Sequence, residues 1–354
     1  MRWPLLVSLS LVPMMLTPDH ATAQTSPETQ PVHRAAWMRR GHWGVMSHYL
    51  ADWIARRENL PDHRMTVDQW NEAIDRFDVE ALADQINATG AAWYILTIGQ
   101  NSGFYCSPNA TYDRIVGTSP SHCSRRDLIS DLADALAKRN VRLVVYLPSG
   151  APNGDAIAKE KLQWQNGAHP NREFQQHWEA IVREWSLRWR TKVSGWWFDG
   201  CYWPNTMYRG DDPPNFKSFA AAVRAGNPDS AIAFNPGVVY RTMSITPYED
   251  YTAGEVDQPE KWMLRRAADG YADGAQIHML SFLGTRWGTG EKPRFSDDDA
   301  IRFSRMLFDA GGAISWDVPI QRNGTISQPF IDQLNVIGKS MRELAATRPA
   351  SSQP

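Results

Sequence analysis

Residues 194–203 read SGWWFDGCYW, which places one acid, Asp199, inside a run of aromatic residues. An unpaired carboxylate buried in such surroundings would cost several kcal/mol. The acid is therefore either paired within the fold or required by a site. Residues 194–199 are mostly apolar without alternation, as expected for a strand that is buried on both faces.

Similar apolar runs recur along the chain and alternate with stretches of helical periodicity. We expect strands at 43–49, 92–97, 142–147, 194–199, 231–236, 251–255, 276–282 and 313–318. Helices are expected at 170–190, 214–226 and 326–343, after Ser124 (with Leu128, Leu132 and Leu136 on one face) and after Ser296. Strands that alternate with helices in this way predict a single-domain α/β fold, a (β/α)8 or TIM-like barrel.

Polar side chains stand at several predicted strand ends. Asp199 ends the fourth strand, Glu255 the sixth and His48 the first, and Asp317 lies near the end of the eighth. In a barrel, all these ends meet at the face that carries active sites. A glycosidase needs two acids there, one to attack or stabilise the anomeric carbon and one to protonate the leaving oxygen.

The chain of 354 residues has a formal net charge of -2 and no long basic run, so nucleic-acid binding is not expected. Arg2, an apolar stretch at 5–16 and Ala21-Thr22-Ala23 predict a cleaved signal peptide at 1–23. A short membrane anchor is the alternative, but the stretch is too short to span a bilayer and contains Pro13. We expect a linker at 24–36, a catalytic barrel at 37–346, a disordered tail at 347–354, a periplasmic or secreted location and no membrane association after cleavage.

The three cysteines are Cys106, Cys123 and Cys201. Cys106 and Cys123 flank a turn-rich loop and are predicted to form a disulfide in an oxidising compartment, with three unlinked thiols as the alternative. Their spacing does not suggest a zinc site, and neither a metal nor a cofactor is expected.

Several segments resemble, in order, the catalytic domain of glycoside hydrolase family 29, the α-L-fucosidases. The resemblance runs from about Trp43 to Ala345. The segments that carry it are HWGVMSHY (42–49), AAWYILT with SGFYC (91–106), WWFDG (196–200), YTAGEVDQPEKW (251–262) and GGAISWDVPIQRNGTISQPFIDQLNVIGKSM (311–341).

The resemblance implies a retaining mechanism with Asp199 as nucleophile and Glu255 as general acid/base. The alternatives to Glu255 as the acid/base are the acids near it in the sequence, Glu249, Asp250, Asp257 and Glu260. The residues implied to contact the sugar are His48, Gln100, Asn101, Trp197, Tyr202, Trp203 and Trp316.

Two departures from the family are visible. Where the family usually has Lys-His-His-Asp-Gly-Phe, this chain has Gly99-Gln-Asn-Ser-Gly-Phe104. We also expect it to lack the family's usual C-terminal β-sandwich. Gln100 and Asn101 can still hydrogen-bond sugar hydroxyls. The sequence therefore predicts an exported retaining α-glycosidase that binds carbohydrate and is most similar to α-L-fucosidases. The alternatives are a glycosidase for an α-galactoside or an unusual deoxy sugar, and a non-catalytic carbohydrate-binding barrel.

Overall fold

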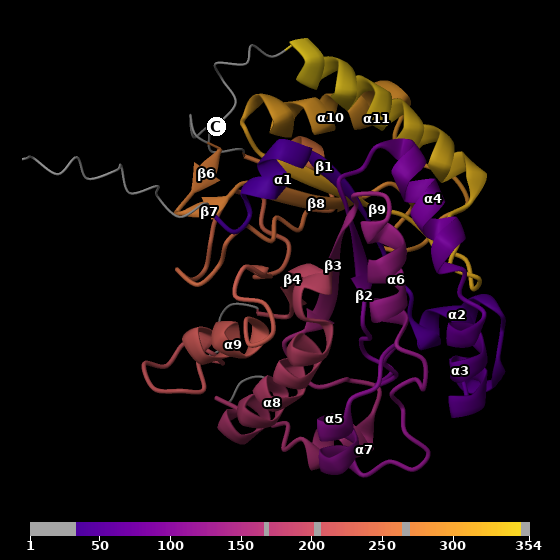
Figure 1. Cartoon of the computed structure of the whole chain (residues 1–354), viewed down its shortest axis with the longest axis vertical. Helices are drawn as coiled ribbons and strands as arrows, with labels where there is room; N and C mark the ends of the chain where they lie inside the picture. The colour runs from indigo at the N-terminus through magenta and orange to yellow at the C-terminus, as the bar shows by residue number, and fades with distance from the viewer. Residues whose placement is uncertain (1–32, 166–169, 202–206, 264–269, 348–354) are drawn as a thin grey trace, which may run out of the picture. The chain divides into compact units, whose positions relative to one another are not determined.

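The computed structural model describes residues 33–165, 170–201, 207–263 and 270–347, and its core is a parallel sheet of seven strands (Figure 1). The order in the sheet is β5-β4-β3-β2-β1-β9-β8. These strands are β1 (Trp43–Ser47), β2 (Trp93–Thr97), β3 (Arg142–Pro148), β4 (Val193–Asp199), β5 (Ala231–Phe234), β8 (His278–Phe282) and β9 (Ala313–Asp317). A separate antiparallel pair consists of β6 (Tyr271–Ala272) and β7 (Ala275–Gln276).

Helices connect most of the strands. They are α1 (Ala36–Gly41), α2 (Ala51–Arg57), α3 (Val67–Asp75), α4 (Val79–Thr89), α5 (Ala110–Val116), α6 (Leu128–Ala137), α7 (Ala156–Lys161), α8 (Arg172–Trp189), α9 (Phe216–Val223), α10 (Asp297–Asp309) and α11 (Gln328–Thr347), with short 3-10 turns at Pro61–His63, Arg190–Lys192 and Pro259–Lys261. Ser296 caps α10 as predicted. The cap of α6 is Asp127 and not Ser124, because the Asp127 carboxylate accepts from the Ser130 backbone N–H while the Ser124 hydroxyl bonds to the Arg126 carbonyl.

Side chains along the strands alternate between two buried clusters. The inner cluster has members from all seven strands of the sheet, including Met46, Ile95, Tyr146, Trp197, Ala233, Leu280 and Ala313. The sheet curls around this cluster, since the rings of Trp93 on β2 and His278 on β8, three strands apart in the order, have centroids only 6.4 Å apart. The residues between these, such as Trp196 and Phe198, pack outward in the larger cluster that the helices cover.

The predicted strand 251–255 is not a strand. Gly254 has a φ of +62°, and only isolated pairs join this segment to its neighbours, Tyr251 with Gln276 and Glu255 with Leu280. The segment nevertheless lies between β5 and β8, because the Asp250 N–H donates to Ile232 and the Leu280 N–H donates to Gly254. Seven of the eight predicted strands are therefore present.

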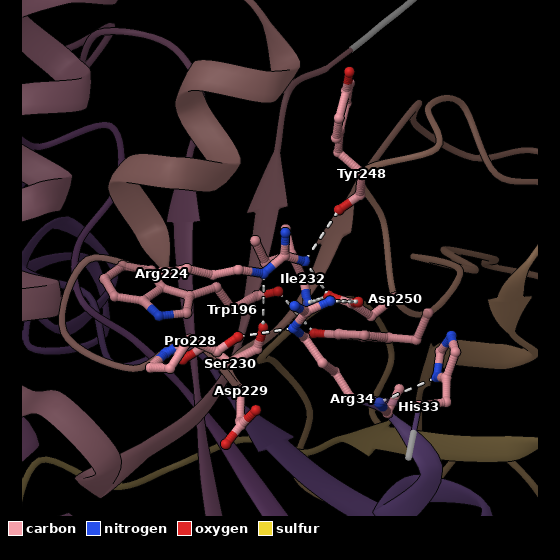
Figure 2. A network of polar contacts seen from close by, with 12 residues as sticks. His33, Arg34, Trp196, Arg224, Pro228, Asp229, Ser230, Ile232, Tyr248 and Asp250 are labelled. Carbon is pink, nitrogen blue, oxygen red and sulfur yellow. Dashed lines mark hydrogen bonds and ion pairs between the residues drawn. The ribbon is translucent and has the colours of Figure 1, made fainter. Parts of the chain in front are cut away.

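Asp250 fastens this segment to β5 (Figure 2). Its Oδ2 accepts from the Ile232 backbone N–H at 2.9 Å and from Arg224 Nη2 at 2.5 Å. Its Oδ1 lies 3.7 Å from Nη1 of Arg34, whose Nε donates to the Pro228 carbonyl. The side chain of Asp250 is only 8% exposed, so its negative charge depends on these partners.

Replacing Asp250 by alanine should lower the free energy of unfolding by roughly 2–3 kcal/mol, because it leaves the largely buried Arg224 without its carboxylate. The measurement is urea unfolding followed by tryptophan fluorescence. Arg34→Ala is the matched control: this guanidinium is 43% exposed and its loss should cost less than about 1 kcal/mol. Equal stability of the wild type and the Asp250 variant would contradict the anchoring role.

Two further predictions need correction. The last residues of the predicted linker belong to the fold, since Ala35 is buried and the His33 ring bonds to the Gly274 carbonyl. The predicted disulfide is not formed: Cys106 and Cys123 are both free, buried thiols. Cys123 pairs through its backbone with Tyr105, and the Cys106 thiol lies 3.5 Å from the Thr97 carbonyl oxygen.

The predicted signal peptide lies outside the described residues, as does the tail after Thr347. Across the described ranges, no helix is long and apolar enough to cross a membrane.

Candidate active site

Asp199 stands at the carboxyl end of β4 and accepts hydrogen bonds from three donors among the described residues. The Tyr146 hydroxyl donates to its Oδ2 at 2.6 Å. The Gly200 backbone N–H and the Asn235 amide donate to its Oδ1 at 2.8 and 2.9 Å. Together these bonds fix the orientation of the carboxyl group.

Asn235 follows β5 and joins Asp199 to Glu255. The same Nδ2 that donates to Asp199 also donates to Glu255 Oε2 at 2.6 Å. Asp199 Oδ1 and Glu255 Oε2 therefore lie no farther apart than the sum of these two hydrogen-bond lengths. That limit agrees with the separation of about 5–5.5 Å between the carboxyl groups of retaining glycosidases.

The surroundings of Glu255 raise its pKa to about 7. Burial contributes most, and the negative charge of Asp199 adds to it, while the bond from Asn235 and the His48 ring partly offset the rise. Glu255 therefore carries a proton over much of the neutral and acidic range, as a general acid must. One carboxyl of the pair is held by three donors and the other is poised to give up a proton.

His48 follows β1 and is oriented by Asp317. Its Nδ1 lies 2.9 Å from Asp317 Oδ1, and the fully buried Asp317 also accepts from the Gly288 backbone N–H. With the Nδ1 proton directed at the carboxylate, Nε2 is the ring atom left to accept from a ligand when the ring is neutral. The ring stacks on Trp53 at a centroid distance of 5.0 Å.

These groups line a cavity of about 110 Å³ at the carboxyl ends of the strands. One wall is aromatic: Trp197 stacks on Tyr146 at 5.3 Å, and its indole N–H donates to the Ala253 carbonyl. The lining consists of Met46, His48, Trp53, Gln100, Tyr146, Trp197, Asp199, Glu255, Leu280 and Trp287. Two carboxyl groups in a small, largely aromatic pocket suit a sugar ring, whose apolar faces stack and whose hydroxyls need polar partners.

The structure brings together most of the site residues predicted from the sequence. Asp199, Glu255, His48, Gln100 and Trp197 all line the cavity. Gln100 is held there by a 2.5 Å bond from its amide to the Tyr146 hydroxyl.

Four predicted contacts lie elsewhere or outside the described residues. Trp316 is fully buried on the helix side of the sheet, where its indole donates to the Ser304 hydroxyl of α10, so it does not reach the cavity. Tyr202 and Trp203 fall outside the described residues. Asn101 is exposed and lines a different cavity.

The alternatives to Glu255 have other partners. Asp250 binds Arg224, and Asp257 accepts from the Tyr240 hydroxyl. Glu249 accepts from the Ile245 backbone N–H. The lining of the small cavity includes Glu255 but none of these three acids, and it does not include Glu260.

The sequence reading missed Asn235, Tyr146, Trp53 and Trp287. Asn235 directly follows β5, so the same strand-end argument that selected Asp199 could have found it. Tyr146 lies within β3, where only the phase of the alternation shows that it faces inward. Trp53 lies on α2 and Trp287 on the loop after β8, and no sequence signal marks them.

A second and larger cavity, of about 770 Å³, opens on the loops that follow β1, β2 and β3. At two points in the chain, neighbouring residues line different cavities: one residue lines this large cavity and the next or previous one lines the small cavity around Asp199 and Glu255. Asp52 lines the large cavity and Trp53 the small one; Asn101 lines the large cavity and Gln100 the small one.

Residues 40–345 match the model of the family described as Alpha-L-fucosidase. This chain belongs to the alpha-L-fucosidase family. No curated protein sequence shows significant similarity to it.

Solved structures of glycoside hydrolases have a similar fold. An endo-fucoidan hydrolase from glycoside hydrolase family 107 superposes with a TM-score of 0.68 at 18% identity, over 88% of this chain and 54% of the other. Alpha-L-fucosidase isoenzyme 1 from Paenibacillus thiaminolyticus gives 0.62 at 17% identity, over 89% and 76%. Alpha-L-fucosidase AlfC from Lactobacillus casei, in complex with alpha-L-fucose product, gives 0.60 at 13% identity, over 88% and 99%. The family member described here spans about half the length of the first of these proteins.

Proposed function

We propose that the protein hydrolyses α-L-fucosides with retention of configuration, using Asp199 as nucleophile and Glu255 as general acid/base. The observation that carries the proposal is the shared amide of Asn235, which bonds to both carboxyl groups and so keeps them close together. Family membership supports the substrate class. A complete (β/α)8 barrel is part of the proposal, with residues 250–256 in the place of the strand between β5 and β8.

In the first step, a carboxylate oxygen of Asp199 attacks the anomeric carbon. The bond from that carbon to the leaving oxygen breaks, and Glu255 gives its proton to this oxygen. In the second step, the ionised Glu255 takes a proton from water as the water oxygen attacks the same carbon. The bond to Asp199 then breaks, which regenerates both groups and releases the sugar in its original configuration.

The remaining groups of the cavity would hold the sugar. Gln100 replaces a family histidine and keeps a carbonyl oxygen and a second amide N–H for hydroxyls, since one N–H is bonded to Tyr146. His48 adds an imidazole nitrogen whose orientation Asp317 fixes. Trp53, Trp197 and Trp287 enclose the space around them.

The test is the stereochemistry of hydrolysis of an aryl α-L-fucoside, followed by proton NMR before mutarotation. We expect α-L-fucose as the first product. Early β-L-fucose would contradict the paired roles of Asp199 and Glu255. Because Gln100 departs from the family pattern, an aryl α-galactoside should be tested in parallel, and a preference for it would reassign the sugar but not the mechanism.

A further inference from the structure

The positions of the catalytic carboxyl groups fix how a sugar must lie in the small cavity. Both groups bond to Asn235, so the anomeric carbon has to sit at the wall formed by β4, β5 and the segment of Glu255. In a six-membered ring, C4 lies across from C1, with C3 beside it. These atoms therefore point to the opposite wall, where His48, Trp53 and Gln100 follow β1 and β2.

That opposite wall is thin. Trp53 and Gln100 face the small cavity, and the residues directly beside them, Asp52 and Asn101, face the large one. The Asn101 amide lies 3.5 Å from the Gln100 side-chain oxygen, so the two residues are also close in space. The large cavity thus lies on the side of the small cavity toward which C3 and C4 point.

The large cavity has the size and surface for several sugar units. Its volume of about 770 Å³ is several times that of the small cavity, at about 110 Å³. Ile157 lines it and gives it an apolar surface, since its side chain is 54% exposed. Arg56, Arg64 and Ser102 add hydrogen-bond donors.

We propose that this cavity binds the part of a carbohydrate chain attached to O3 or O4 of the sugar beside Asp199 and Glu255, so that the enzyme cleaves inside a fucose-containing chain. The inference rests on the proposed function, because the orientation of the ring follows from the catalytic roles. The same reaction takes place at the anomeric carbon; only the substituent on the far side of the ring differs.

The experiment compares two substrates. One is an α-linked fuco-tetrasaccharide labelled at its reducing end, and the other is the same compound with O3 and O4 of its non-reducing terminal residue methylated. We expect di- and trisaccharides among the first products, and comparable cleavage of the methylated compound. Release of fucose alone, with no cleavage of the methylated compound, would overturn the inference while the proposed function stands. If neither the tetrasaccharide nor an aryl α-L-fucoside is hydrolysed, the proposed function itself is overturned.

A variant locates the binding. Ala156 is exposed at the start of α7 and lines the large cavity, so Ala156→Trp fills part of it. Relative to an aryl α-L-fucoside, kcat/KM for the methylated tetrasaccharide should fall at least about tenfold. Glu160→Trp is the matched control, on the exposed side of the same helix and outside the lining, and should leave this ratio unchanged. Equal ratios in both variants would contradict binding in this cavity.

Discussion

Replacing Asp199 by glycine is expected to lower kcat on an aryl α-L-fucoside on the order of 10⁴-fold, as removal of a nucleophile does in other enzymes. The reason is geometric: three donors hold this carboxylate at the end of β4, and Glu255 cannot take its place while it must act as the acid. The measurement is initial rates with a chromogenic substrate, at a protein concentration high enough to detect the residual turnover.

Added azide separates loss of the nucleophile from loss of the fold. In Asp199→Gly, azide fits the space of the missing carboxylate and attacks the anomeric carbon from that side as the aryl group leaves. The product is the β-fucosyl azide, with inverted configuration. Wild-type turnover in the Asp199 variant would refute its role, and an unchanged urea midpoint would show that the loss is chemical.

Replacing Glu255 by glutamine is expected to have the second-largest effect, and it should depend on the leaving group. A sugar or alkyl leaving group needs the proton, so kcat/KM should fall by about 10²–10⁴-fold. A dinitrophenyl leaving group departs without one, so the first step should be nearly normal. Stopped-flow measurement of the aryl release separates these cases.

The same variant should change the pH profile. Glu255 must be protonated to donate, and its pKa is raised to about 7, so the wild-type kcat/KM should be highest below that pH and fall as the pH rises through it. Glu255→Gln cannot titrate and should lose this alkaline limb. An unchanged limb would assign the titration to another group. Asp257→Asn is the matched control: this acid bonds to Tyr240 outside the cavity, so its variant should keep the alkaline limb, shifted slightly to lower pH because the charge of Asp257 contributes to the raised pKa of Glu255.

The sequence predicted the parts of the site that follow from strand ends. Asp199 and His48 were predicted because apolar runs without alternation mark buried parallel strands, whose ends lie at one face. Gln100 was predicted only from the family resemblance. The same runs do not reveal the phase of the alternation, because both faces are buried. For that reason Trp316 was assigned to the sugar although it packs against α10, and Tyr146 was overlooked although it faces inward.

Other features depend on contacts far apart in the sequence. Glu255 was predicted at the end of a strand, but Gly254 breaks the regular backbone there, and the position is set by Asp250 and by single pairs with β7 and β8. The bond from Asn235 to both carboxyl groups joins residues separated by 36 and 20 positions. The prediction of a Cys106–Cys123 disulfide was wrong for a related reason, because the spacing of two cysteines in the sequence does not say which way each thiol points.

Because the backbone around Gly254 is irregular, the position of Glu255 should tolerate insertions and deletions better than the position of Asp199. Asp199 belongs to a continuous strand, where one inserted residue would shift the register and turn every following side chain to the other face. The segment around Glu255 is held by single backbone pairs and by Asp250 instead of a continuous ladder, so an insertion or deletion beside Glu255 shifts this segment without changing the register of β4. We therefore expect descendants of this fold to conserve the attacking acid by position and to supply the protonating acid from different points of the loop.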